Sequence, residues 1–130
     1  IIMFFGVSTN STADHKLIQL GDSGGIETSG YLSTSVAHEG ASSQAAYDSS
    51  AGFFMYDKSG AGEVLSGHMF LTLQDSTNHT WISSHTVKND GNGTSVGGGS
   101  KASLDSVLTQ IKIGLVEGAF DAGVINIMYQ

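Results

Sequence analysis

Residues 64–87 read VLSGHMFLTLQDSTNHTWISSHTV, two runs of alternating side chains separated by a polar stretch. The alternation divides the first run into two faces, which are Met69, Leu71 and Leu73 on one side and His68, Phe70 and Thr72 on the other. In the second run, Trp81 and Ile82 fall on opposite faces. A period of two residues is that of a β-strand. The stretch therefore predicts two strands joined by a hairpin turn at residues 75–79.

Similar runs occur along the rest of the chain, with turn-forming residues between them. Further strands are expected at residues 1–7, 16–20, 26–35, 52–57, 107–115 and 125–129. Residues 89–93 contain Asp-Gly and Asn-Gly pairs and predict a tight turn. Residues 38–51 lack an apolar stripe and predict a loop. The sequence thus predicts one all-β domain over residues 1–130, an antiparallel β-sandwich or jelly roll.

The composition limits the classes of partner. The chain has 12 acidic residues, five lysines and no arginine, which gives a formal net charge of −7. Nucleic acids and anionic membranes are bound through cations that neutralise phosphate, so neither is expected as a partner. The lack of cysteine excludes disulfides and thiolate metal sites, and no apolar run is long enough for a membrane span. Neutral glycans and protein surfaces are the expected partners, and no cofactor is expected.

Residues 21–25 spell GDSGG, the nucleophile loop of trypsin-like serine proteases, and residues 12–15 spell TADH. A catalytic triad of that kind is assembled between two β-barrels, which need about twice this length of chain. The chain before Ser23 is too short to build the first barrel. We therefore interpret GDSGG as a turn between strands and expect no catalytic residues.

Other polar residues fall short of a metal or catalytic motif. The histidines include no His-x-His pair, although His68 and His85 could approach each other across the hairpin, and no metal ligand is expected. Residues 90–94 have oxygen-bearing side chains at alternate positions, as calcium loops do, but lack the glutamate that completes such a loop. No pair of acidic residues stands out for glycoside hydrolysis.

Aromatic side chains near predicted loops are the best candidates for binding a sugar. Their rings can stack on its apolar face, while neighbouring Asp and Asn side chains hydrogen-bond its hydroxyl groups. The candidate ligand-binding residues are Tyr47, Tyr56, Asp57, Trp81, Asp90 and Asn92. A single tryptophan in an alternating strand is more often a core residue. Trp81 is therefore interpreted either as a ligand contact or as part of the core.

Two segments resemble a C-terminal module of the tail-fibre and virion proteins of tailed phages. They are residues 6–31, GVSTNSTADHKLIQLGDSGGIETSGY, and residues 103–129, SLDSVLTQIKIGLVEGAFDAGVINIMY. The closest correspondence lies at residues 6–10, 19–31, 120–123 and 125–127, together with Trp81. The chain departs from that family in having no arginine in the closing strand and in the run at residues 114–117. The resemblance implies an exposed, trimeric virion module at the end of a longer fibre, and no catalytic residues carry over from it.

These observations favour a non-enzymatic phage virion module that attaches to a host surface glycan. The alternative is a capsid decoration or capping domain that binds only other virion proteins. A third hypothesis, a depolymerase of surface polysaccharide, needs two acidic catalytic residues that the sequence does not identify. Under the first two hypotheses the module is a homotrimer on the tail fibre or the capsid surface.

Overall fold

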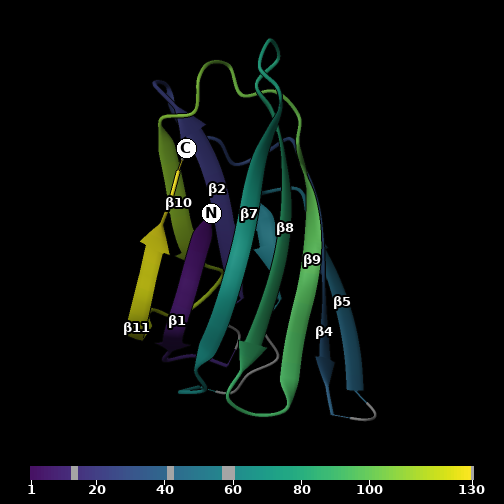
Figure 1. Cartoon of the computed structure of the whole chain (residues 1–130), viewed down its shortest axis with the longest axis vertical. Coiled ribbons are helices and arrows are strands. Elements are labelled where there is room, and N and C mark those ends of the chain that lie inside the picture. The colour runs from purple at the N-terminus through teal and green to yellow at the C-terminus, as the bar shows by residue number, and fades with distance from the viewer. Residues whose placement is uncertain (13–14, 41–42, 57–60, 130) are drawn as a thin grey trace.

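The computed structural model describes residues 1–12, 15–40, 43–56 and 61–129. These residues form strands and turns, and among them no helix is long and apolar enough to cross a membrane. The strands are β1 (Ile2–Thr9), β2 (Lys16–Asp22), β3 (Gly25–Ile26), β4 (Tyr31–Glu39), β5 (Ser43–Ser49), β6 (Phe53–Met55), β7 (Leu65–Asp75), β8 (Thr80–Asn89), β9 (Gly93–Lys101), β10 (Gln110–Leu115) and β11 (Phe120–Ile127) (Figure 1).

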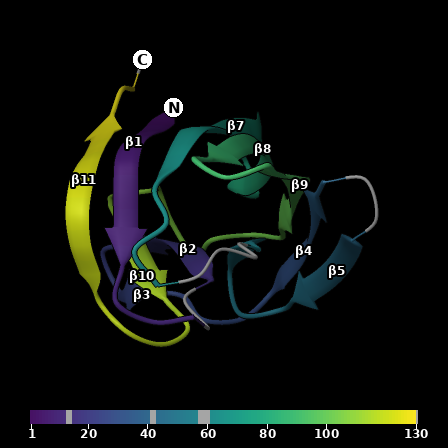
Figure 2. The same cartoon turned by 90° about the horizontal axis from the view of Figure 1, so that it is seen from below.

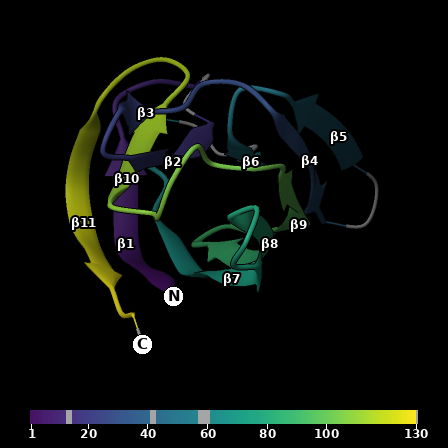
Figure 3. The same ribbon diagram turned by 90° about the horizontal axis from the view of Figure 1, so that it is seen from above.

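Two antiparallel sheets pack together as a β-sandwich, which confirms the predicted fold class. The large sheet has the strand order β11-β1-β7-β8-β9-β4-β5. The small sheet has the order β10-β2-β3, with β6 also paired to β2. The large sheet curves around the small one, which lies against its concave side (Figures 2 and 3).

The predicted hairpin is strands β7 and β8, which form the centre of the large sheet. Leu73 pairs with Trp81, and Met69 pairs with His85. Met69 is fully buried whereas Phe70 is exposed, so the two faces predicted from the alternation are confirmed. The turn predicted at residues 89–93 connects β8 to β9 and is also confirmed.

The main core fills the space between the sheets. Its buried side chains include Ile2 and Met69 from the large sheet, Ile18 and Leu20 from β2, and Phe53 from β6. Alternate residues of a strand point to opposite faces, so in the central strands side chains such as Met69 and Val87 point to the core while their neighbours point away from it. The convex face of the large sheet therefore points to solvent.

Serine side chains attach β6 to the large sheet. The backbone N–H of Phe54 donates to Ser33 Oγ at 2.9 Å, and that of Tyr56 donates to Ser35 Oγ at 3.0 Å. Both serines face inward from β4 and are buried. They satisfy N–H groups that would otherwise be buried without a partner.

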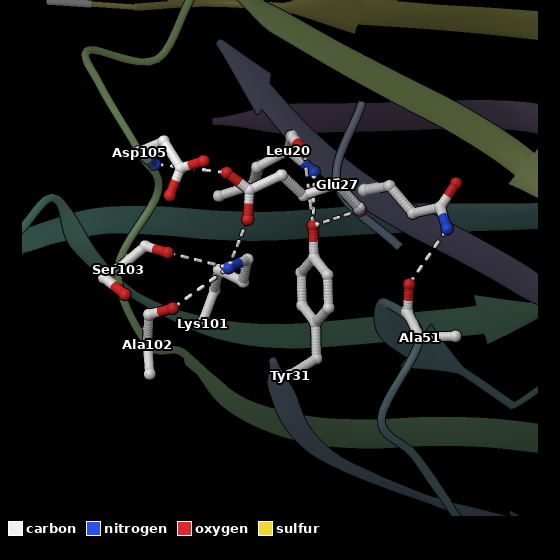
Figure 4. Close-up of polar contacts among 9 residues, drawn as sticks. Leu20, Glu27, Tyr31, Ala51, Lys101, Ala102, Ser103 and Asp105 are labelled. Carbon is white, nitrogen blue, oxygen red and sulfur yellow. Dashed lines mark hydrogen bonds and ion pairs between the residues drawn. The ribbon is translucent and has the colours of Figure 1, made fainter. Parts of the chain in front are cut away.

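A second polar link joins the sheets at the end of β9 (Figure 4). Lys101 is only 2% exposed, and its Nζ lies 2.6 Å from Glu27 Oε2 and 2.9 Å from each of two backbone carbonyl oxygens. Beside it, the Tyr31 hydroxyl oxygen accepts a hydrogen bond from the backbone N–H of Leu20 at 2.7 Å. A buried ammonium group is costly without partners, so these contacts fix the chain after β9 against the small sheet.

Several parts of the chain differ from the sequence prediction. Strand β9 falls where no strand was expected, and β11 begins at Phe120, five residues before the strand expected at residues 125–129. The expected loop at residues 38–51 instead forms the end of β4 and the edge strand β5. The expected strand at residues 26–35 is interrupted between Ile26 and Tyr31. The expected strand at residues 107–115 begins only at Gln110, and the side chain of Val107 is exposed.

Candidate functional site

Four rings gather where the β5 edge of the large sheet meets the small sheet. This aromatic cluster consists of His15, Tyr47, Phe54 and Tyr56. The ring centroids of Tyr47 and Tyr56 lie 4.5 Å apart, and those of His15 and Tyr56 lie 4.6 Å apart. The centroids of His15 and Phe54 lie 5.4 Å apart. These distances fall in the range of about 4.5–7 Å at which aromatic pairs interact favourably.

Three separate segments supply the rings of the aromatic cluster. Tyr47 lies on the edge strand β5. Phe54 lies on β6, and Tyr56 directly follows that strand. His15 directly precedes β2, and the antiparallel pairing of β2 with β6 brings His15 beside Tyr56.

The aromatic cluster has a buried base and one exposed ring. Phe54 and Tyr56 are 8% and 7% exposed, and Leu17 packs against them. Tyr47, in contrast, is 50% exposed. A ring that is already fixed by packing loses little conformational freedom when a ligand binds. The cluster can therefore stack on a flat apolar surface, such as the C–H face of a sugar.

The other candidate residues are not all gathered at the aromatic cluster. Asp57 lies outside the described residues. Asp90 and Asn92 lie in the β8–β9 turn, where Asp90 Oδ1 accepts a hydrogen bond from the backbone N–H of Val64 at 3.2 Å. Trp81 lies near the start of β8, so the length of that strand, about 30 Å, separates it from Asp90. The structure thus brings Tyr47 and Tyr56 together and separates Trp81 from the turn residues.

Trp81 packs against the main core, in agreement with its interpretation as a core residue. It also lines an apolar groove of about 490 Å³ together with Leu71, Leu108 and Ile111. Its indole nitrogen is buried and has no hydrogen-bond partner among the described residues. This groove lies apart from the aromatic cluster, since none of the four clustered rings lines it.

Known proteins offer no relative from which a role could be transferred. No protein-family model, curated protein or solved structure matches the chain. The resemblance to phage virion modules therefore stays a prediction. The role of the aromatic cluster is inferred from its own geometry.

A serine and a histidine lie side by side in the core, next to the aromatic cluster. Ser35 Oγ is 3.0 Å from His85 Nε2 and 3.0 Å from Ser95 Oγ. Burial lowers the pKa of His85 to about 4, so its ring is neutral at pH 7. Ser35 has no exposed surface, and its hydroxyl oxygen also accepts the N–H of Tyr56. A substrate cannot reach this hydroxyl in the folded chain, and the contacts instead hold β6 in place.

The structure also tests the sequence motifs. GDSGG forms the turn between β2 and β3, as predicted, and Asp22 Oδ1 accepts the N–H of Gly24 at 2.7 Å. The suggested approach of His68 to His85 does not occur, because His68 faces solvent and His85 faces the core. Within the described part of the chain, no three His, Asp or Glu side chains are grouped closely enough to hold a metal ion.

Sequence reasoning missed two members of the aromatic cluster. Phe54 had an available signal, because it lies two residues from Tyr56 and so shares its face of the chain. The sequence contains no such signal for His15, because this residue reaches the aromatic cluster only through the pairing of β2 with β6.

Proposed function

We propose that the chain is a carbohydrate-binding module that holds a neutral glycan against the aromatic cluster. The observation that supports this most directly is that the ring of Tyr47 is half exposed and packs on the buried ring of Tyr56, with 4.5 Å between the two ring centroids. A pyranose has an apolar C–H face that packs on such a ring, and its hydroxyl groups stay hydrated or hydrogen-bonded at the rim.

The charge of the chain favours a neutral ligand over a charged one. Twelve acidic residues against five lysines repel anionic polysaccharides. A single exposed ring gives weak affinity, which becomes effective when several copies bind one surface together. That property suits attachment, and the resemblance to phage virion modules supports a non-enzymatic role in host attachment.

A protein contact within the virion is the second candidate function. The convex face of the large sheet exposes Leu32, Phe70 and Ile82, and Leu32 is 77% exposed. Exposed apolar side chains that share one face can mark a protein contact. A capsid decoration or capping domain would use this face to bind other virion proteins.

A glycan array probed with the full chain tests the proposal. The strongest neutral oligosaccharide is then titrated against wild type, Tyr47→Ala and Phe70→Ala. Phe70 is the matched control, because its ring is 43% exposed but lies on the convex face. We expect Tyr47→Ala to weaken binding about tenfold or more, which corresponds to a loss of about 1.4 kcal/mol. Phe70→Ala should leave the affinity unchanged.

Each other outcome of the titration is informative. An array without saturable binding by the wild-type chain contradicts carbohydrate binding. Binding that survives Tyr47→Ala unchanged shows that the glycan occupies another site. Loss of binding in Phe70→Ala alone places the ligand on the convex face.

A further inference from the structure

The free edge of β11 can accept another strand. β11 is the last strand of the large sheet and pairs with β1 on one side only. It lies at the outer rim of the sandwich, with no described strand beyond it (Figures 2 and 3). Seven of its eight residues are exposed. Such an edge presents unpaired N–H and C=O groups to any approaching strand.

The ladder with β1 shows which backbone groups of this edge point outward. The N–H of Met128 donates to the carbonyl oxygen of Ile1 at 2.9 Å, so the backbone groups of Met128 point toward β1. These groups alternate in direction along an antiparallel strand, which leaves those of Ile125 and Ile127 pointing away from β1. The ladder has no register shift over residues 124–127, so this part of the edge is regular.

The regular part of this edge lacks the charged residues and prolines that often prevent strand pairing. Natural edges are protected by lysine, proline or inward charges, and residues 122–129 contain no charged residue and no proline. Asp121, the one charged residue of β11, lies outside the regular part and accepts a hydrogen bond from Ser8 Oγ. Exposed apolar side chains surround the edge, including Phe5 at 76% and Val124 at 62%.

We infer that β11 is a self-association site, at which two copies of the chain pair antiparallel about a twofold axis at Asn126. In this register Asn126 lies opposite Asn126 of the second copy, and Ile125 lies opposite Ile127. Val124 then lies opposite Met128. The outward N–H and C=O groups of Ile125 and Ile127 become hydrogen-bonded pairs across the axis. Apolar side chains face apolar ones, and an amide faces an amide.

A second copy is the partner that fits this edge, because residues 124–128 are self-complementary about their centre. Pairing by a twofold axis uses the same surface on both copies and closes on itself. The net charge of −7 on each copy opposes association, and salt screens this repulsion. Association should therefore strengthen as salt is added. The contact gives a dimer, which distinguishes it from the trimer that the phage resemblance implies.

The mass of the full chain in solution tests this inference. Sedimentation or light scattering over a range of concentrations should show a dimer of twice 13.5 kDa, or 27 kDa. Asn126→Lys and Asn126→Asp should each give monomers, because like charges then face each other across the axis. An equal mixture of the two variants should restore the dimer. The control Gln44→Lys adds a charge to the exposed edge strand β5 and should remain dimeric.

Amide hydrogen exchange gives a second measurement at the same site. The N–H groups of Ile125 and Ile127 should exchange more slowly as the protein concentration rises. A wild-type chain that stays monomeric at about 1 mM, where even weak specific contacts form, overturns the inference. A trimer, a dimer that persists in Asn126→Lys, or a mixture of folded variants that stays monomeric also overturns it.

Discussion

Lowering the pH is expected to destabilise the fold through His85. Its side chain is 4% exposed, and burial lowers its pKa from 6.5 to about 4. In the unfolded chain the same imidazole binds a proton near pH 6.5, so between these two values the unfolded state binds more protons. The stabilisation that comes from the neutral ring is therefore fully present above about pH 6.5 and is lost as the pH falls toward 4.

The size of the effect follows from the two pKa values. One unit of pKa shift corresponds to about 1.4 kcal/mol. Relative to neutral pH, the free energy of unfolding should fall by about 1 kcal/mol at about pH 5.5 and by about 2 kcal/mol at about pH 4.5. Small domains have a total stability of about 5–15 kcal/mol, so this loss is a large fraction of the whole.

Urea unfolding at several pH values measures this loss directly. The fluorescence of Trp81, the one tryptophan of the chain, reports unfolding. His85→Gln is the matched control, because its amide does not titrate and can still hydrogen-bond the Ser35 hydroxyl. The difference in unfolding free energy between the two chains should change by about 2 kcal/mol between neutral pH and about pH 4.5, since all other titrating groups are shared. If the unfolding free energies of the two chains change in parallel with pH, the reasoning is refuted, because His85 then has the same pKa in the folded and unfolded states.

Two further substitutions test how the strands are held together, by the same urea unfolding. Lys101→Met should destabilise the chain by about 2 kcal/mol, because Glu27 loses its ion-pair partner. Adding Glu27→Gln to this variant should recover part of the loss. An unchanged stability of Lys101→Met would contradict a stabilising role of the ion pair. Gly99→Ala should destabilise by about 1–3 kcal/mol, because the added Cβ would lie 2.1 Å from the carbonyl oxygen of Leu32. Gly114→Ala, in β10, is the control. It should change stability by less than about 0.5 kcal/mol, because the atom nearest to the added Cβ would be 3.6 Å away. Equal effects of the two glycine substitutions would contradict the close approach of Gly99 to the backbone of β4.

The large sheet could be predicted from the sequence wherever an apolar side chain fills every second position. Strand β7 meets this condition over residues 69–73, where Met69 and Leu71 pack in the core. Strand β4 does not, because its inward positions Ser33 and Ser35 bond the edge of β6 instead of filling space. The hydrophobic period therefore fades there, and β4 and β5 could not be recognised in full.

The aromatic cluster was only partly predictable, for a related reason. The sequence identifies Tyr47 and Tyr56 as aromatic residues near expected loops, but it contains no signal that they lie together. Their contact depends on the pairing of β5 with β4 and on the serine contacts that hold β6 over β4. Long-range pairing of this kind has no local sequence signal, and the same holds for His15.

The most direct test of the proposed function is an NMR titration of the isotope-labelled chain with a neutral oligosaccharide that it binds. The proposal predicts that the backbone amide shifts concentrate at residues 15, 47 and 54–56, while the indole N–H of Trp81 stays in place. Shifts centred on Trp81, or spread over the convex face around Phe70, would contradict the assignment of the aromatic cluster as the glycan site.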